Sequence, residues 1–218
     1  MAMQGFERAR SDEAKTIRER SILDAARRLG EAHGIREVTL TDIAEAIGMH
    51  KSALLRYFET REQIFLRLTA AEWEHWSAEL RSALSAEDVA TPASIARDFA
   101  RTLAARPLFC DLLAQTPLNL ERNVSMDSVR SFKLVTHREV DAIIANLREL
   151  LPRLTPEQAL DLIATATSMA GAQWQMANPG PEAAALYRSD PRLAHAIVDL
   201  EPRLARVLTA LIEGFLVE

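Results

Sequence analysis

Apolar residues recur about every three to four positions along most of the chain, and sustained alternation of apolar and polar residues is nearly absent. The first spacing is typical of amphipathic helices, whereas alternation is typical of strands. Proline, glycine and threonine interrupt the pattern at intervals, and these residue types begin or end helices. The sequence therefore predicts an all-α protein of about eight to ten helices, without a sheet.

Local signals place the ends of these helices. The first helix should run from about Glu13 to His33 and end at Gly34, which can take the left-handed conformation of a C-terminal cap. Thr60 and Gln63 have the capping-box spacing at the start of a long helix over 61–84. Further helices are expected to begin at Thr91-Pro92, near Pro107, near Val124 (ending at Pro152) and at Thr155-Pro156, and to cover 181–187, 192–200 and 202–217.

Two short helices, over 39–48 and 51–58, are predicted to meet at Gly48, where a glycine permits a positive φ. The apolar side of this corner consists of Ile43, Ile47, Leu54 and Phe58, and the donors opposite belong to His50, Lys51, Ser52, Arg56 and Tyr57. A helix-turn-helix has this arrangement, because its second helix enters the DNA major groove with one side and packs with the other. An ordinary corner between two helices is the alternative interpretation.

The neighbourhood of the corner favours DNA binding over that alternative. Thr39 and Thr41 stand at the start of the first short helix, where hydroxyls and free backbone amides suit a phosphate. Three short helices at one chain end bury little surface unless they form a separate module. We therefore expect a DNA-binding unit at this end of the chain.

The stretch VTLTDIAEAIGMHKSALLRYFETREQIFLRL resembles the N-terminal domain of tetracycline-repressor-type (TetR family) transcriptional regulators. The resemblance covers about residues 13–66. It rests on Thr39, Ile43-Ala44, Gly48, Leu54, Arg56-Tyr57-Phe58 and a basic residue at position 61. It implies that Thr39 and Tyr57 contact phosphates, that residues 51–53 face base edges, and that Arg61 holds the DNA backbone. The expected DNA contacts are Thr39, Thr41, His50, Lys51, Ser52, Ala53, Arg56, Tyr57 and Arg61.

Two residues depart from the family pattern. Leu55 replaces an aromatic residue that is often found there, which removes an expected phosphate contact. His50 stands where serine is frequent, which weakens the helix N-cap but offers a ring donor to the groove.

The distribution of charge is compatible with this reading, although the net charge is −5. Residues 1–61 have a net charge of +1 and residues 62–218 a net charge of −6, so the acidic excess lies outside the DNA-binding unit. Arg8, Arg10, Lys15 and Arg18 could follow an adjacent groove or phosphate track, or form a solvated tail.

The resemblance implies two domains, a helix-turn-helix DNA-binding domain over 1–60 and a ligand-binding and dimerisation domain over 61–218. An apolar or aromatic effector fits the larger part better than a highly charged one. The candidate pocket residues are Trp73, Trp76, Phe99, Leu103, Phe109, Met126, Phe132, Met169, Gln173 and Trp174. For each of them, a place in the ordinary core is the alternative, because aromatic and methionine residues at helical spacing usually pack there.

The helices over 156–177 and 202–217 are the candidates for dimerisation, since the last helix has a broader apolar side than one stripe. A symmetric four-helix interface would cover it, and packing within the monomer is the alternative. The candidate interface residues are Leu160, Ile163, Thr167, Leu204, Leu208, Leu211 and Phe215. A homodimer would present two recognition helices to a palindromic operator.

Two other functional classes remain as alternatives for an all-α chain: a helical-bundle enzyme and a helical adaptor that binds protein. The sequence contains no Gly-x-Ser-x-Gly, phosphate-binding loop, His-Glu-x-x-His or paired cysteines. Glu72 and His75 form one Glu-x-x-His pair, and a di-iron bundle would need a second. Cys110 is the single cysteine, which excludes an internal disulfide. We expect no enzyme, no cofactor and no metal.

The sequence has no run of about 18 apolar residues and no apolar signal core near its start, so we expect a cytoplasmic protein without membrane contact. The sequence as a whole predicts a homodimeric, ligand-responsive regulator. We expect a repressor that a small hydrophobic effector releases from operator DNA.

Overall fold

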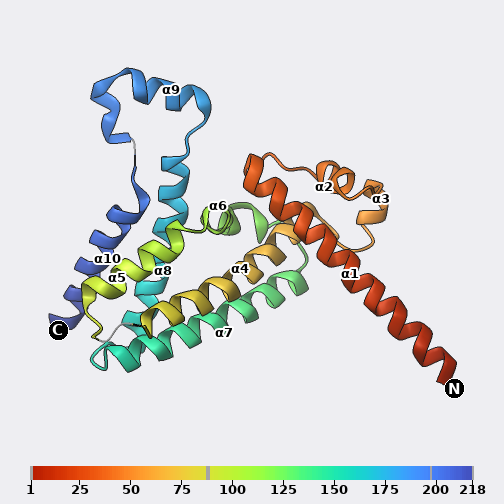
Figure 1. Cartoon of the computed structure of the whole chain (residues 1–218), viewed down its shortest axis with the longest axis horizontal. Coiled ribbons are helices and arrows are strands. Elements are labelled where there is room, and N and C mark those ends of the chain that lie inside the picture. Colours follow the sequence, from red (N-terminus) through yellow and green to blue (C-terminus); the bar gives the residue numbers. More distant parts are fainter. Residues whose placement is uncertain (1, 87–88, 197, 218) are drawn as a thin grey trace.

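The computed structural model describes residues 2–86, 89–196 and 198–217; the side chains of 2–12 and 194–196 lie outside the described part. Over these ranges the chain is helical and contains no strand (Figure 1). The elements are α1 (Ala2–His33), α2 (Leu40–Ala46), α3 (Lys51–Leu54), α4 (Arg61–Leu84), α5 (Pro92–Ala104), α6 (Pro107–Gln115), a π-helical turn (Thr116–Leu120), α7 (Met126–Leu150), α8 (Pro156–Ala177), α9 (Pro181–Ser189), a 3₁₀ turn (Pro191–Ala196) and α10 (Leu200–Val217). The all-α prediction is confirmed.

The predicted capping residues begin their helices. Thr60, Thr91 and Thr155 each accept a hydrogen bond from the backbone amide three residues on. At the start of α4 the second half of the expected box differs, because the Gln63 side chain accepts from the amide of Glu59, at 2.7 Å, rather than from that of Thr60. Gly34 has a φ of +81°, as predicted for the residue that ends α1.

Three predicted helix limits are wrong. α1 begins at Ala2 rather than at Glu13, because most of the residues before Glu13 are good helix formers. The expected helix over 192–200 is a 3₁₀ turn, since the Asp190 side chain accepts from the amide of Arg192 and holds a local turn. α10 begins at Leu200, because Pro202 falls in its first turn, where no backbone donor is needed.

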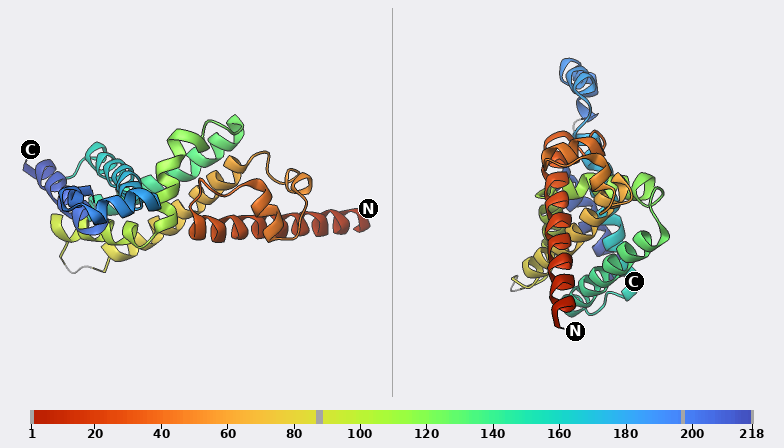
Figure 2. Two further views of the ribbon diagram at one scale, coloured as in Figure 1. Left: turned by 90° about the horizontal axis from the view of Figure 1, so that it is seen from above. Right: turned by 90° about the vertical axis from the view of Figure 1, so that its right-hand side faces the viewer.

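The helices of the larger part form two groups that share α4. The smaller group consists of α4 and α7, and the larger group of α4, α5, α6, α8 and α10. α4 packs along α7, while α10 packs against α5 and α8, and α6 packs against α8 (Figure 1). α2 and α3 lie beside α1, whose N-terminal half extends beyond the rest of the molecule (Figure 2). The start of α1 and the end of α10 lie far apart (Figure 1).

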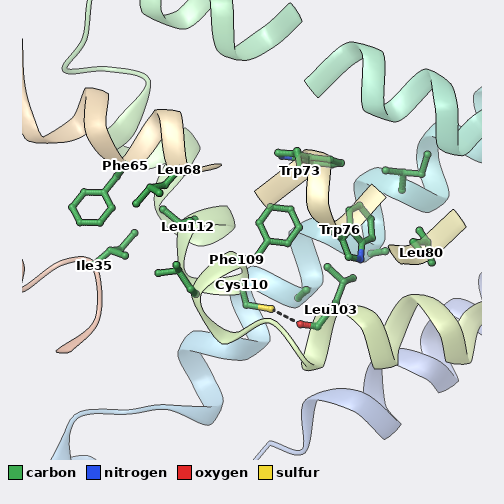
Figure 3. Packing of buried hydrophobic residues seen from close by; sticks show 14 of the residues in the cluster. Ile35, Phe65, Leu68, Trp73, Trp76, Leu80, Leu103, Phe109, Cys110 and Leu112 are labelled. Atoms are coloured by element: carbon green, nitrogen blue, oxygen red, sulfur yellow. Dashed lines mark hydrogen bonds between the residues drawn. The ribbon is translucent and has the colours of Figure 1, made fainter. Parts of the chain in front are cut away.

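The core of the larger group is a cluster of aromatic rings (Figure 3). Trp73 lies 5.3 Å from Trp76 and 5.7 Å from Phe109 between ring centroids, both in edge-on geometry. The ring nitrogen of Trp76 donates to the hydroxyl of Thr102 at 3.0 Å, so its polar group is satisfied. These rings hold α4, α5 and α6 together.

Candidate nucleic-acid interface

The turn between α2 and α3 is built from a capped helix and one left-handed glycine. The Thr39 side chain accepts from the amide of Asp42 at 3.2 Å, and the amide of Thr39 donates to the Asp42 carboxylate at 2.7 Å. The Thr39 hydroxyl also donates to this carboxylate, at 2.7 Å, and the bonds from the hydroxyl and the amide of Thr39 lower the pKa of Asp42. Gly48 has a φ of +64°, as the sequence predicts, and the amide of Met49 donates to the carbonyl of Ala44 at 2.8 Å. The turn therefore has fixed geometry.

Burial divides this segment into the two sides that its pattern predicts. Ile43, Leu54 and Phe58 are buried, and Ile47 is half-buried. The polar side is open to solvent, with His50, Lys51, Ser52 and Arg56 exposed and Ala53 and Tyr57 half-buried. The described part of the chain shows no hydrogen bond or ion pair on the side chains of those four exposed residues. They are available to an external partner.

The second helix of the corner, residues 51–58, is called the recognition segment here, and its regular helix is shorter than predicted. α3 ends at Leu54 rather than at Phe58, and the backbone continues as a turn in which the amides of Tyr57 and Phe58 both donate to the carbonyl of Leu54. This turn brings Phe58 into the core. His50 precedes α3 without a side-chain capping bond, as expected from the absence of serine there.

Arg61 has protein partners. Its guanidinium donates to the carbonyls of Ile35 and Val38 and pairs with Glu62 at 2.9 Å. It thereby joins the start of α4 to the loop between α1 and α2. A DNA contact by Arg61 would have to share the guanidinium with these carbonyls.

Thr41 is the remaining predicted DNA contact, and the basic residues of α1 are a separate candidate set. Thr41 is exposed in the first turn of α2, beside Thr39. Lys15 is exposed and lies 3.9 Å from Glu19, and Arg18 is exposed as well, whereas the side chains of Arg8 and Arg10 lie outside the described residues.

The structure brings five of the predicted effector residues together and separates the other five. Trp73, Trp76, Leu103 and Phe109 are buried together in the aromatic core (Figure 3), and the buried Phe99 lies 5.9 Å from Trp76 between ring centroids. Met126 is 72% exposed at the start of α7, and Met169 and Trp174 are half-buried on α8. Gln173 is buried, and its side-chain oxygen has no hydrogen-bond partner among the residues that the structure describes.

Phe132 lines a groove of about 570 Å³ between α4 and α7. Leu66 and Ala70 of α4 form one wall, and Ser128 of α7 and Leu23 of α1 complete it. Sequence reasoning missed these residues, apart from Phe132. Ala70 and Ala71 are small, but α4 also carries Ala78 and Ala83, so the sequence does not single them out.

The predicted dimer residues also fall into two sets. Ile163, Thr167, Leu204 and Leu208 are buried within the single chain. Leu160 is 46% exposed, and Leu211 and Phe215 are half-buried. A second copy could reach only this second set directly.

Charged side chains connect α1 to the larger group of helices. Glu72 is 3% exposed and pairs with Arg27 of α1 and with Arg106, which lies 3.1 Å away between α5 and α6. Arg106 also pairs with Glu79 at 2.7 Å. The Glu72 carboxylate is therefore a buried ion-pair partner. His75 is exposed, 3.9 Å from it.

Comparison with known proteins decides the class. The model for bacterial regulatory proteins of the tetR family matches residues 22–68, and the model for the tetracyclin repressor-like C-terminal domain matches residues 70–218. The chain belongs to the TetR family. TetR-family proteins are DNA-binding transcription factors, so the enzyme and adaptor alternatives are set aside.

Individual TetR-family relatives agree with this assignment. The chain is 30% identical over 139 residues to the HTH-type transcriptional repressor Rv1474c of Mycobacterium tuberculosis, a match that covers 55% of this chain and 73% of that protein.

No helix in the described ranges combines the length and apolar character needed to cross a membrane.

Solved structures share the fold at low sequence identity. The fatty acid degradation regulator FadR from Bacillus halodurans superposes with a TM-score of 0.57 at 14% identity, covering 88% of this chain and 93% of that one. FadR from Thermus thermophilus, in complex with lauroyl-CoA, gives 0.57 at 18% identity, covering 91% and 93%. A possible TetR-family regulator from Streptomyces coelicolor A3(2) gives 0.58 at 17% identity, covering 91% and 98%.

Proposed function

We propose that this TetR-family regulator is a homodimeric repressor that binds a palindromic operator and is released by a small hydrophobic effector. The observation that carries the proposal is the division of the recognition segment. Leu54 and Phe58 anchor it in the core, while Lys51, Ser52 and Arg56 stay exposed, and their side chains have no hydrogen-bond partner among the described residues. The name of the Mycobacterium tuberculosis relative supports repression as the sign of regulation.

The proposed DNA contacts divide by chemistry. Lys51 and Ser52 carry donors to base edges, with His50 and Ala53 beside them, and Arg56 lies on the same exposed side. Thr39, Thr41 and Tyr57 lie where hydroxyls meet phosphates at the start of α2 and after α3. Arg61 acts at one remove, since its guanidinium holds the loop between α1 and α2.

The chain divides at about residue 60 in this proposal, with DNA binding in 1–60 and effector binding and dimerisation in 61–218. Leu160 of α8 and Leu211 and Phe215 of α10 leave apolar surface for a second copy. Burying that surface in a two-fold interface would remove it from water and fix two recognition segments in one particle.

The effector site that we propose is the groove between α4 and α7. Its floor is apolar at Leu66 and Phe132, and its rim is polar at Ser128. An elongated apolar molecule with a polar end fits such a lining. Support comes from Thermus thermophilus FadR, whose structure of the same fold contains lauroyl-CoA. Because Leu23 of α1 forms part of the wall, an occupant would touch both proposed domains.

Operator binding can be tested by selecting bound fragments from random duplex DNA and titrating the best one at two salt concentrations. We expect an inverted repeat and a steep loss of affinity with salt, since phosphate contacts release counterions. Failure to enrich any sequence, with salt-independent binding, would contradict the function.

Effector binding can be tested by thermal shift with lauric acid and lauroyl-CoA on the wild type and on Ala70→Phe, which fills the groove. A rise in Tm for the wild type that is lost in the variant supports the groove. An equal rise in both proteins places the ligand elsewhere.

A further inference from the structure

α6 lies in close contact with both α1 and α8. A Cβ at Gly30 of α1 would lie 3.1 Å from the Leu108 side chain of α6. A Cβ at Gly171 of α8 would lie 2.9 Å from the backbone nitrogen of Ala114, also on α6. The approach at Gly171 is to backbone and leaves no room for a Cβ, whereas at Gly30 the Leu108 side chain would have to shift slightly. α6 therefore packs tightly on α8 and closely on α1.

Asp111 of α6 makes a hydrogen bond on each of these sides. One carboxylate oxygen accepts from the backbone amide of Ile35, in the loop between α1 and α2, at 2.9 Å. The other accepts from the side-chain amide of Gln175 on α8 at 2.8 Å. Asp111 is 9% exposed; its bond to Ile35 is buried, and its bond to Gln175 is part-buried.

The loop at Ile35 is held from its other side as well. Arg61, at the start of α4, donates to the carbonyl of Ile35. A shift of Asp111 relative to α8 would therefore move the peptide groups on both sides of Ile35, and with them the start of α2. No other described side chain hydrogen-bonds both this loop and α8.

We propose that Asp111, supported by Gln175, is a positioning residue that sets the spacing between operator half-sites. The inference rests on the proposed function, in which α8 and α10 form the two-fold interface of a DNA-binding dimer. In such a dimer the symmetry axis fixes α8. Any rotation of the α2–α3 unit relative to α8 is repeated in the partner subunit. Both displacements therefore add to the change in distance between the two recognition segments.

A structural role alone makes a different prediction. If Asp111 only satisfied the buried amide of Ile35, its loss would lower the stability of the fold and weaken binding equally at every spacing. If it positions the recognition unit, its loss widens the range of spacings that the dimer accepts. Spacing selectivity is therefore the readout that separates the two roles.

The experiment uses the full-length protein and the selected operator, with the distance between half-sites changed by one base pair in either direction. Each step moves a half-site by about 3.4 Å along the duplex. For the wild type we expect affinity to fall about tenfold or more at either altered spacing, comparable to the cost of a mismatched base pair.

Three variants test the positioning residue. Gln175→Ala removes the bond to α8 and keeps that to Ile35, and we expect the spacing preference to fall to about twofold, well below the cost of a mismatch, with Tm nearly unchanged. Asp111→Asn retains an acceptor for the amide of Ile35 and a donor for a reoriented Gln175, so it should keep the wild-type preference. Met176→Ala, an exposed neighbour on α8, is the matched control.

An unchanged spacing preference in Gln175→Ala would overturn the inference, and so would an equal loss of affinity at all three spacings. A wild-type protein that binds no selected DNA at any spacing would instead overturn the proposed function, and the inference with it.

Discussion

At the scale of single residues, two arginines five positions apart have opposite roles. Arg56 is exposed and has no partner within the described part of the chain, whereas Arg61 donates to two backbone carbonyls of the loop between α1 and α2. Their sequence context is similar, since both lie in the stretch that resembles the TetR-family N-terminal domain and predicts DNA contacts. Tertiary position alone distinguishes a side chain that is free for DNA from one that holds the fold.

Substituting each arginine by alanine should therefore have separate consequences. Arg61→Ala leaves two part-buried carbonyls without their donor and should reduce the free energy of unfolding by about 1–3 kcal/mol. Arg56→Ala should leave the free energy of unfolding within about 0.5 kcal/mol of the wild type while weakening operator binding. Urea unfolding and fluorescence anisotropy measure the two effects. Equal unfolding midpoints for both variants would refute the assignment to Arg61.

At the scale of elements, helix ends and the corner at Gly48 follow from local sequence, whereas burial on the long helices does not. Threonines 60, 91 and 155 cap helices because the capping bond joins residues three apart. The exposed side at Lys51 is likewise local, since Leu54 and Phe58 point the other way.

The predictions for the last helix and for the pocket depend on packing partners, and so they could not be read from spacing. On α10 the apolar side is split, with Leu204 and Leu208 covered by the chain and Val207 38% exposed. Trp73 and Trp76 fill the core because α5 and α6 lie against α4. Asp111 gave no signal at all, since both of its partners are distant in sequence.

The start of α7 provides a prediction at this scale. Glu59, just before α4, accepts hydrogen bonds from the hydroxyls of Ser125 (2.6 Å) and Ser128 (3.0 Å) in the first turn of α7. These bonds lower the pKa of Glu59 from its ordinary value of 4.5. Because the pKa is depressed in the folded state, the stabilisation is fully present above the unfolded value and is lost as the pH falls through the folded value.

Glu59→Gln should accordingly be less stable than the wild type at pH 7, and the difference in Tm should shrink as the pH falls below about 4.5. Glu45→Gln is the control, because it removes an exposed carboxylate of α2 that has no hydrogen-bond or ion-pair partner among the described residues. Thermal unfolding between pH 7 and pH 3 provides the comparison. A difference in Tm that stays constant over this range would rule out the bond between Glu59 and α7.

At the scale of the whole molecule, the regulator account needs two chains. Leu160 of α8 and Val207 of α10 are 46% and 38% exposed, and both belong to helices that pack together. Exposed apolar groups on helices that pack together mark a candidate interface. The dimer would place two recognition segments about 34–36 Å apart, or a multiple of that distance.

A charge at this surface should separate the subunits without unfolding them. Leu160→Glu combined with Val207→Glu should shift the protein from dimer to monomer and abolish tight operator binding, since a carboxylate in an apolar interface must be desolvated. Leu134→Glu, at a 63% exposed position on α7, controls for added charge. Sedimentation velocity measures the oligomeric state. A dimer that survives the double substitution would place the interface elsewhere.

The central claim is that the exposed side of α3 enters the duplex, and site-directed DNA cleavage tests it most directly. Cys110 is fully buried and burial raises its pKa to about 12, so a cysteine introduced at Ser52 is the one that an iron chelate would modify. The account predicts strand cuts at two symmetry-related places in the operator, about one helical turn or a multiple of it apart. The control carries the chelate on a cysteine introduced at the exposed Glu149 of α7. Cutting from position 52 that is no stronger than cutting from position 149 would contradict the claim.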